Sequence, residues 1–293
     1  MSSDTESEEK HLENGCWING RFYGSWKRGT YVFPIDSEEL ERLDIFHKCF
    51  LVARCEPFSA PITRRSPKIM DLGTGTGIWP ICLAEEKLLV RCPNYGHRLE
   101  PGSARITDLW PQIYGNVFEH LAPDHGYIEH VEIDWTPRWQ GDDQPENSYF
   151  QRWSELFLSS MDKSNRSARV VPAKMQQLIK AAGFTDVKEK VIQAFVCPWT
   201  SDSHEQDVAR WFNLALSRSF ETLSMMPLIE KQGLTYEKVS ELCARAREEI
   251  CVLQNHAFCN IYVWTARKPE GCLSNAHIGQ TETVDRTFDA EIN

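Results

Sequence analysis

The sequence lacks any long apolar run. No stretch approaches the roughly eighteen apolar residues that a membrane-spanning helix needs. The first ten residues are polar and acidic, without the apolar core of a secretory signal. With 293 residues, 41% of them hydrophobic, the chain can bury one sizeable core, or at most two small ones. We therefore expect no contact with membranes.

The ten cysteines lack the pattern of a metal or redox motif. None forms a Cys-x-x-Cys pair, and they are scattered among apolar residues. Cys251, His256 and Cys259 come nearest to a cluster, but their spacing is not that of a zinc site. We expect reduced thiols, an intracellular location and no metal site.

An excess of basic residues is also missing. The net charge is −10, whereas proteins that bind DNA unaided normally present a basic face. The dense basic spots are Arg64-Arg65-x-x-Lys68 and Arg267-Lys268, which we interpret as solvated loop ends. The composition therefore disfavours direct nucleic-acid binding, but it leaves open a chromatin role through partner proteins.

What is present divides the chain into four parts. Residues 1–13 are polar and expected to be disordered, and residues 270–293 are expected to form a flexible tail. Residues 14–66 hold an aromatic, glycine-containing segment and then a helix capped by Asp36 or Ser37. Residues 67–269 form the main domain. The apolar pattern of the helix predicts one face made of Leu40, Leu43, His47, Phe50 and Leu51.

The main domain alternates strands with helices. Strands are predicted over residues 68–72, 127–135, 184–196 and 260–266, the first of them buried, with helices that include 76–88 and 109–121. This order is typical of an α/β fold with a mainly parallel sheet covered on both faces. The final strands flank an inserted helical block, which fits an antiparallel edge.

A glycine-rich turn carries the strongest chemical signal. The spacing Asp71-x-Gly73-x-Gly75-x-Gly77 follows a predicted strand and opens a helix. Glycines let the backbone approach a ligand closely. Ile78 stands where a dinucleotide fingerprint needs glycine, and no lysine follows as in a phosphate loop. The spacing is similar to motif I of S-adenosylmethionine methyltransferases, and the competing interpretation is an ordinary strand-to-helix turn. The predicted cofactor contacts are Asp71, Gly73, Thr74, Gly75, Thr76 and Gly77.

The flanking segments make the resemblance more specific. The chain from about residue 13 to residue 269 resembles the LaeA-type regulators of fungal secondary metabolism. The resemblance rests on Gly20-Arg-Phe-Tyr-Gly24, Gly29-Thr-Tyr-Val-Phe-Pro34, Asp71 to Trp79, Val131-Glu-Ile-Asp-Trp135, Cys197-Pro-Trp199 and Ala209-Arg-Trp-Phe-Asn213. It implies a class I, Rossmann-like methyltransferase fold, S-adenosylmethionine as cofactor, velvet-domain partners and a nuclear location.

The middle of the chain is short for that fold. Residues 78–126 provide 49 residues between Gly77 and Tyr127. The elements expected there need on the order of 80–90 residues. We therefore predict that strands 2–4 are missing through a shortening around residues 88–108. Glu100 lies at the distance of a ribose-binding acid, but in a loop flanked by proline and glycine. A non-catalytic interaction subunit with a degenerate methyltransferase fold is the alternative function.

Several other side chains have two interpretations each. Tyr23, Trp26 and Tyr31 could close over a cofactor or pack beneath a loop. His130 could act as a base within an acidic cluster, or belong to the polar end of a strand. Trp153 and Trp211 are predicted to lie in the core. The cluster comprises Glu129, His130, Glu132 and Asp134. No catalytic residue is assigned from the sequence.

Overall fold

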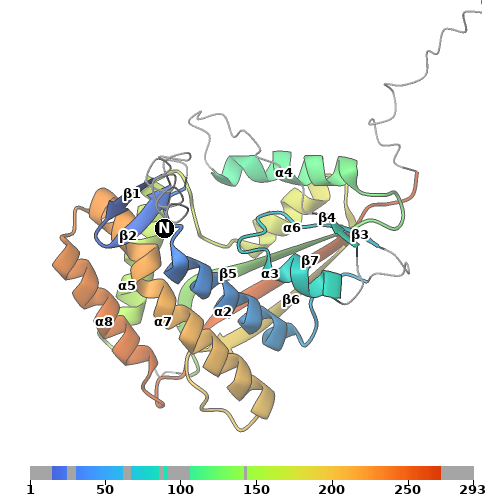
Figure 1. Ribbon diagram of the computed structural model, residues 1–293. Coiled ribbons are helices and arrows are strands. Elements are labelled where there is room, and N and C mark those ends of the chain that lie inside the picture. The colour runs from blue at the N-terminus through green and yellow to red at the C-terminus, as the bar shows by residue number, and fades with distance from the viewer. Residues whose placement is uncertain are drawn as a thin grey trace, which may run out of the picture.

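The computed structural model describes residues 15–24, 31–61, 67–85, 89–91, 106–141 and 144–271 (Figure 1). The expectation of disorder over residues 1–13 and most of the tail expected over residues 270–293 lie outside these ranges, as do Trp26 and Glu100. Within them, no helix is long and apolar enough to span a membrane.

The main sheet has three strands in the order β5-β7-β6. These are β5 (Tyr127–Trp139), β6 (Thr185–Phe195) and β7 (Ala257–Arg267). β7 pairs antiparallel with both neighbours, and a bulge interrupts β5 between Asp134 and Arg138. The antiparallel arrangement of the final strands is confirmed. The prediction of a mainly parallel sheet is wrong for the described residues, where parallel pairing is confined to two short strands.

Those two strands are β3 (Lys68–Met70) and β4 (Leu89–Arg91), separated by α3 (Ile78–Glu85). The strand predicted over residues 68–72 is therefore shorter than expected. It is also not buried, because Lys68 is exposed and Leu72 is 49% exposed. β4 ends at Arg91, so no acidic residue stands at the end of this second parallel strand.

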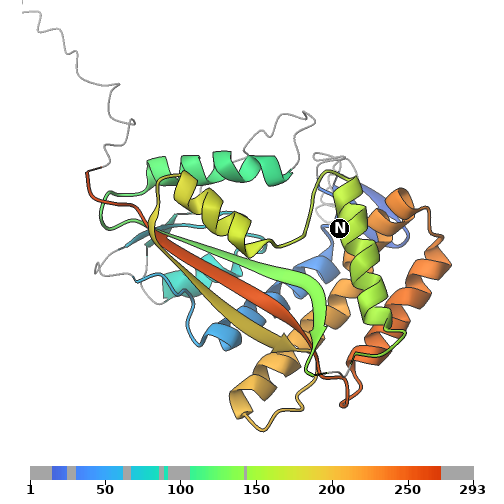
Figure 2. The ribbon, with the colours of Figure 1, turned by 180° about the vertical axis from the view of Figure 1, so that it is seen from behind.

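Two helices cover one face of the main sheet (Figures 1 and 2). They are α4 (Ile106–His120) and α6 (Pro172–Ala181), and α6 begins with the rigid proline that favours a first helical turn. Their apolar side chains pack on the sheet in one core cluster, which includes Tyr114, Val117, Ile128, Met175, Ile179 and Trp264.

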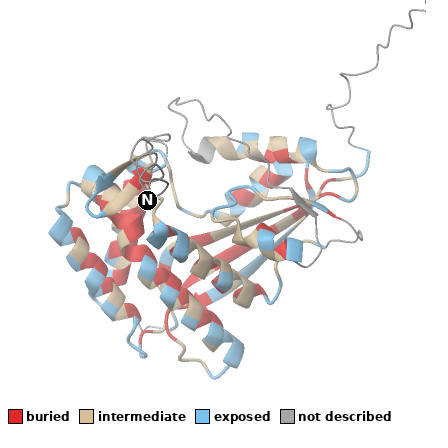
Figure 3. Cartoon of the chain, viewed as in Figure 1, coloured by how far each residue is buried: buried red, intermediate tan, exposed pale blue. Residues whose placement is uncertain are grey.

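The larger core lies among four further helices and the other side of the sheet (Figure 3). These are α2 (Ser37–Arg54), α5 (Tyr149–Lys163), α7 (Ser203–Gln232) and α8 (Tyr236–Ile250). Trp153 is fully buried and its Nε1 donates to Ser224 Oγ over 2.6 Å, which confirms its predicted core position. Trp211 is half-buried beside this core.

The buried face of α2 differs from the predicted one. Asp36 caps the helix as expected, accepting from the Glu39 backbone N–H. However, Leu40 is 46% exposed, while Glu39 and Arg42 are buried. The two charges form a bidentate pair at 2.6 Å, so each satisfies the other away from water. The buried residues of this face are Glu39, Arg42, Phe46, Cys49, Ala53 and Arg54.

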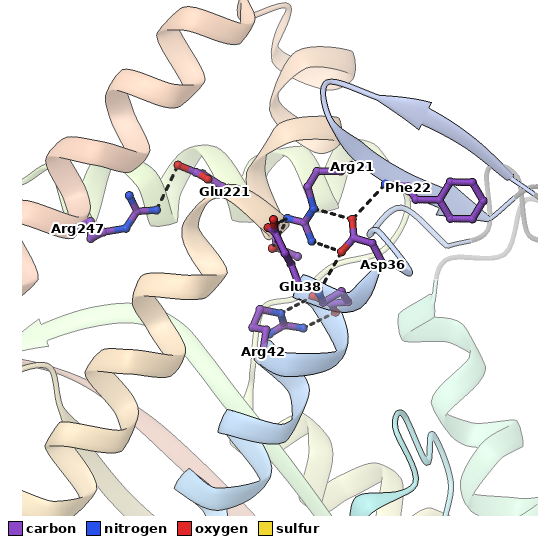
Figure 4. A network of polar contacts seen from close by, with 9 residues as sticks. Arg21, Phe22, Asp36, Glu38, Arg42, Glu221 and Arg247 are labelled. Carbon is purple, nitrogen blue, oxygen red and sulfur yellow. Dashed lines mark hydrogen bonds and ion pairs between the residues drawn. The ribbon is translucent and has the colours of Figure 1, made fainter. Parts of the chain in front are cut away.

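A small hairpin is fastened to the start of α2 (Figure 4). β1 (Gly15–Ile18) and β2 (Arg21–Gly24) are joined by Asn19 and Gly20, both at positive φ, which suits a tight hairpin turn. Arg21 binds Asp36 through two 2.7 Å hydrogen bonds and reaches Thr222 of α7 over 2.9 Å. Asp36 therefore caps α2 and anchors the hairpin at once.

Candidate functional site

The glycine turn occupies the predicted place between β3 and α3. Gly73, Gly75 and Gly77 have φ angles of 79°, 56° and 80°. All three lie in the left-handed region, where a Cβ costs roughly 1 kcal/mol or more per residue. The backbone conformation itself therefore explains why glycine occupies every second position.

The space beside the turn is open. A Cβ added at Gly73 or Gly77 would meet no described atom within 4 Å, and one at Gly75 would lie 3.6 Å from Leu43 Cδ1. Residues 72–75 are exposed. The glycines are thus not required by packing against other described parts of the chain, and the backbone is accessible to a bound molecule.

Side-chain hydroxyls hold the shape of the turn. Thr74 Oγ1 donates to Asp71 Oδ2, and the Gly77 N–H donates to the Thr74 carbonyl over 2.9 Å. Thr76 Oγ1 accepts from the Ile78 N–H at the start of α3. Of the predicted contacts, Asp71, Thr74 and Thr76 therefore hold the turn in shape through their side chains. The backbone of Gly77 is engaged within the turn and α3, whereas Gly73 and Gly75 are exposed.

Helix α2 supports the turn from one side. Thr76 Oγ1 donates to Asp44 Oδ1 over 2.6 Å, and Leu43 lies beneath Gly75. One turn later, His47 is half-buried, and its Nε2 is buried without a hydrogen-bond partner among the described residues. Burial and the nearby Arg54 lower the pKa of His47, so its ring is neutral at pH 7. Of the predicted face of α2, Leu43 therefore lies against the glycine turn.

Sequence reasoning missed an ion pair that joins α2 to the sheet. Arg54 Nη1 donates to Glu129 Oε1 over 2.5 Å, and Glu129 Oε2 also accepts from the backbone N–H groups of Ser59 and Ala60. Trp79 Nε1 donates to the Pro57 carbonyl over 2.9 Å, so the same loop also contacts α3. These bonds fix the position of α3 relative to β5.

The acidic cluster predicted on β5 does not form one group. Successive side chains of a strand point to opposite faces. Glu129 meets α2, whereas Asp134 pairs with Arg138 over 2.6 Å. The Glu132 carboxylate can only accept, so His130 Nε2 donates to it over 3.0 Å, and in the neutral ring Nδ1 is then the acceptor for Tyr114 Oη at 2.7 Å. Because both ring nitrogens are engaged, the expectation of His130 as a free base is not supported.

The aromatic residues before the turn also separate. Tyr23 is 5% exposed, and burial raises its pKa to about 12. It lies on β2 of the hairpin, and its side chain is buried. Tyr31 is 43% exposed and its ring contacts Phe33. On the hairpin itself, Trp17 is 62% exposed and leans on Phe22, with ring centroids 5.4 Å apart.

Comparison with known proteins identifies the family. No family model matches the chain. The secondary metabolism regulator laeA of Gibberella zeae is 52% identical, over 90% of this chain and 95% of that protein. The chain belongs to the LaeA/LAE1 family of secondary metabolism regulators. LAE1 of Gibberella fujikuroi is also 52% identical, over 92% of this chain and 97% of that protein, and LAE1 of Hypocrea atroviridis is 42% identical, over 90% and 86%.

The alignments with these LaeA/LAE1 proteins are longer than the number of residues of this chain that they contain. The match to the Gibberella zeae protein extends over 301 positions, while 90% of 293 residues is about 264. About 37 aligned positions therefore have no residue of this chain opposite them. The alignment gives the size of this difference, which is close to the 40 or so residues that the spacing after Gly77 predicts.

One solved structure overlaps loosely with this LaeA/LAE1 chain. It is phosphoethanolamine N-methyltransferase 2 of Haemonchus contortus, in complex with phosphomonomethylethanolamine and S-adenosylhomocysteine. The TM-score is 0.36 and the identity 13%, over 81% of this chain and 62% of that one.

Proposed function

We propose that this LaeA/LAE1-family protein binds S-adenosylmethionine at its glycine turn and regulates secondary-metabolite genes as a methyltransferase. The observation that carries the proposal is the conformation of Gly73, Gly75 and Gly77. All three have positive φ, and the space beside them is open. The contacts to the methionine end of the cofactor would come from this backbone, with Asp71, Thr74 and Thr76 holding its shape.

The chemistry asks mainly for alignment. Transfer from a sulfonium is a direct displacement that leaves a neutral thioether, so a strong base matters less than positioning. The chain contributes rigidity through Asp44 beneath the turn and through the Arg54–Glu129 pair beside it. The methyltransferase unit is proposed to span residues 67–269.

A non-catalytic interaction subunit is the second candidate. The observation that favours it is the shortfall of about 37 positions relative to the 301 aligned with the Gibberella zeae protein. We place this shortening around residues 88–108, where ribose and adenine contacts are expected. Calorimetric titration with S-adenosylmethionine separates the candidates: saturable heat supports the methyltransferase, and its absence supports the interaction subunit.

The regulatory role is proposed to operate in the nucleus, in a complex with velvet-domain proteins. The net charge of −10 supports recruitment through a partner rather than direct DNA binding. The anchored hairpin offers a contact surface, since Trp17 is 62% and Ile18 38% exposed. Exposed tryptophans are frequent anchors of protein interfaces. Tight, salt-sensitive binding of the purified protein alone to duplex DNA would contradict this proposal.

A further inference from the structure

The outer edge of β5 is unpaired in the described part of the chain. β5 is 13 residues long and pairs there with β7 alone (Figure 2). Among the described residues, no strand pairs with the backbone N–H and C=O groups of its other edge. Such an edge readily accepts an added strand.

A hollow of about 580 Å³ lies along this edge. Glu132 and Trp135 of β5 line it together with Trp110 of α4, residues 165 and 167–171, and the start of α6. Glu132 and Trp135 are three positions apart, so they start from opposite faces of the strand. A single hollow that touches both must extend around the edge of β5.

Among the described residues, Glu132 is the carboxylate of β5 that has no lysine or arginine in an ion pair with it. Glu129 is paired with Arg54 and Asp134 with Arg138, whereas Glu132 has no lysine or arginine partner among the described residues. It is nevertheless held in place, because His130 donates to it and is itself held by Tyr114.

The surroundings of Glu132 suit a basic side chain. The Trp110 ring packs on His130 with centroids 4.6 Å apart, so an indole stands next to the carboxylate. Indole faces attract cations, and a carboxylate adds a charge-assisted hydrogen bond. Of the basic groups that line the hollow, Arg169 is already bound to Asp162 over 2.7 Å. Lys174 is exposed on the first turn of α6 and can turn into solvent.

We propose that an extended segment of a partner protein binds along the free edge of β5 as an added strand, with a lysine or arginine side chain against Glu132. The proposal does not depend on cofactor binding. It also disfavours a second copy at this edge, because pairing β5 with itself would bring acidic strands together.

The test uses immobilised seven-residue peptides that alternate threonine and valine around a varied central residue. The full-length protein should bind lysine and arginine peptides about tenfold better than norleucine or glutamate peptides, as one charge-assisted hydrogen bond implies. Glu132→Lys should invert the preference toward aspartate and glutamate. Glu241→Gln, an exposed change on α8, should leave the preference unchanged. N-methylation of alternate backbone amides should abolish binding, because strand addition needs those N–H groups.

Each contrary result overturns the proposal. Failure to bind any peptide, or equal binding of lysine and norleucine peptides, would contradict a partner with a basic side chain against Glu132. Undiminished binding of N-methylated peptides would contradict binding as an added strand. Sedimentation could instead show a dimer that lysine peptides do not dissociate. If Val131→Pro disrupts that dimer, the edge of β5 binds a second copy of the chain.

Discussion

Thr76 donates a hydrogen bond to Asp44 over 2.6 Å, and this bond connects the glycine turn to the middle of α2. The two residues are 32 positions apart in the sequence. Thr76 lies near the end of the glycine turn, and Asp44 lies near the middle of α2. The same hydroxyl accepts from the N–H of Ile78, the first residue of α3. A single threonine thus links the turn, its support and the helix that follows.

We expect Thr76→Val to destabilise the protein by about 1 kcal/mol, because the partly buried hydrogen bond to Asp44 is lost while the side chain keeps nearly the same volume. Urea unfolding measures the change. Thr76→Ser retains the hydroxyl and is the matched control. A valine variant as stable as the serine variant would show that this bond does not support the turn.

The Arg21–Asp36 pair predicts a specific acid sensitivity. Burial opposes ionisation of Asp36, but hydrogen bonds from Arg21 and from the backbone N–H groups of Phe22 and Glu39 outweigh it and lower the pKa of this carboxyl. A folded-state pKa below the unfolded value gives stability that is present above the unfolded pKa. That stability is lost as the pH falls through the folded pKa.

We therefore expect Asp36→Asn to cost about 2 kcal/mol at pH 7, because hydrogen bonds to a charged partner are lost. The difference from the unsubstituted protein should shrink as the pH falls below about 4, the ordinary aspartate range. Chemical unfolding at a series of pH values measures it. A difference that stays constant down to the acid limit would contradict the role of this ion pair.

The exposed hairpin predicts a partner defect without a folding defect. Trp17→Ala should reduce recovery of velvet-domain proteins from nuclear extract, while the thermal midpoint changes little because Trp17 is 62% exposed. Tyr236→Ala, which removes an exposed aromatic ring from α8, is the control. Equal recovery by both variants would place the interface elsewhere. Removal of the whole hairpin is a poorer test, because Arg21 binds α2 and α7.

Local patterns predicted the turn and several elements correctly, because their causes are local. The spacing of the three glycines predicts the turn, and the acidic first turn of α2 predicts a cap at Asp36 or Ser37, of which the structure has Asp36. The buried face of α2 was mispredicted because hydrophobicity alone does not reveal that Glu39 and Arg42 neutralise each other. The Arg54–Glu129 pair joins residues 75 positions apart, and no local sequence pattern predicts it.

The sheet shows the same division between local and distant causes. Alternation over β5 and β7 predicted strands, but their direction depends on which strands lie next to each other. A parallel sheet was expected from the strand–helix order. In the described ranges the parallel part contains the three-residue strands β3 and β4, so the antiparallel strands dominate.

The shortened middle predicts a gain from restoration. Inserting the corresponding residues of the Gibberella zeae protein around residues 88–108 should raise both the thermal midpoint and the affinity for S-adenosylmethionine. A longer sheet buries more apolar surface and supplies the ribose contacts. Differential scanning calorimetry and titration measure the two effects. A glycine-serine insert of equal length is the control. Micromolar affinity and a high midpoint in the chain without any insert would contradict the expected loss of stability and binding.

The most direct measurement is the calorimetric titration of S-adenosylmethionine into three proteins: the unsubstituted chain, Gly73→Ala and Gly233→Ala. Gly73 and Gly233 have φ angles of 79° and 67°, and an added Cβ would meet no described atom within 4 Å at either position. The two substitutions therefore impose similar backbone strain, one in the glycine turn and one at the end of α7. We expect saturable binding to the unsubstituted chain and to Gly233→Ala, and at least about tenfold weaker binding to Gly73→Ala. Equal affinities of the two variants, or no binding to the unsubstituted chain, would contradict a cofactor site at the glycine turn.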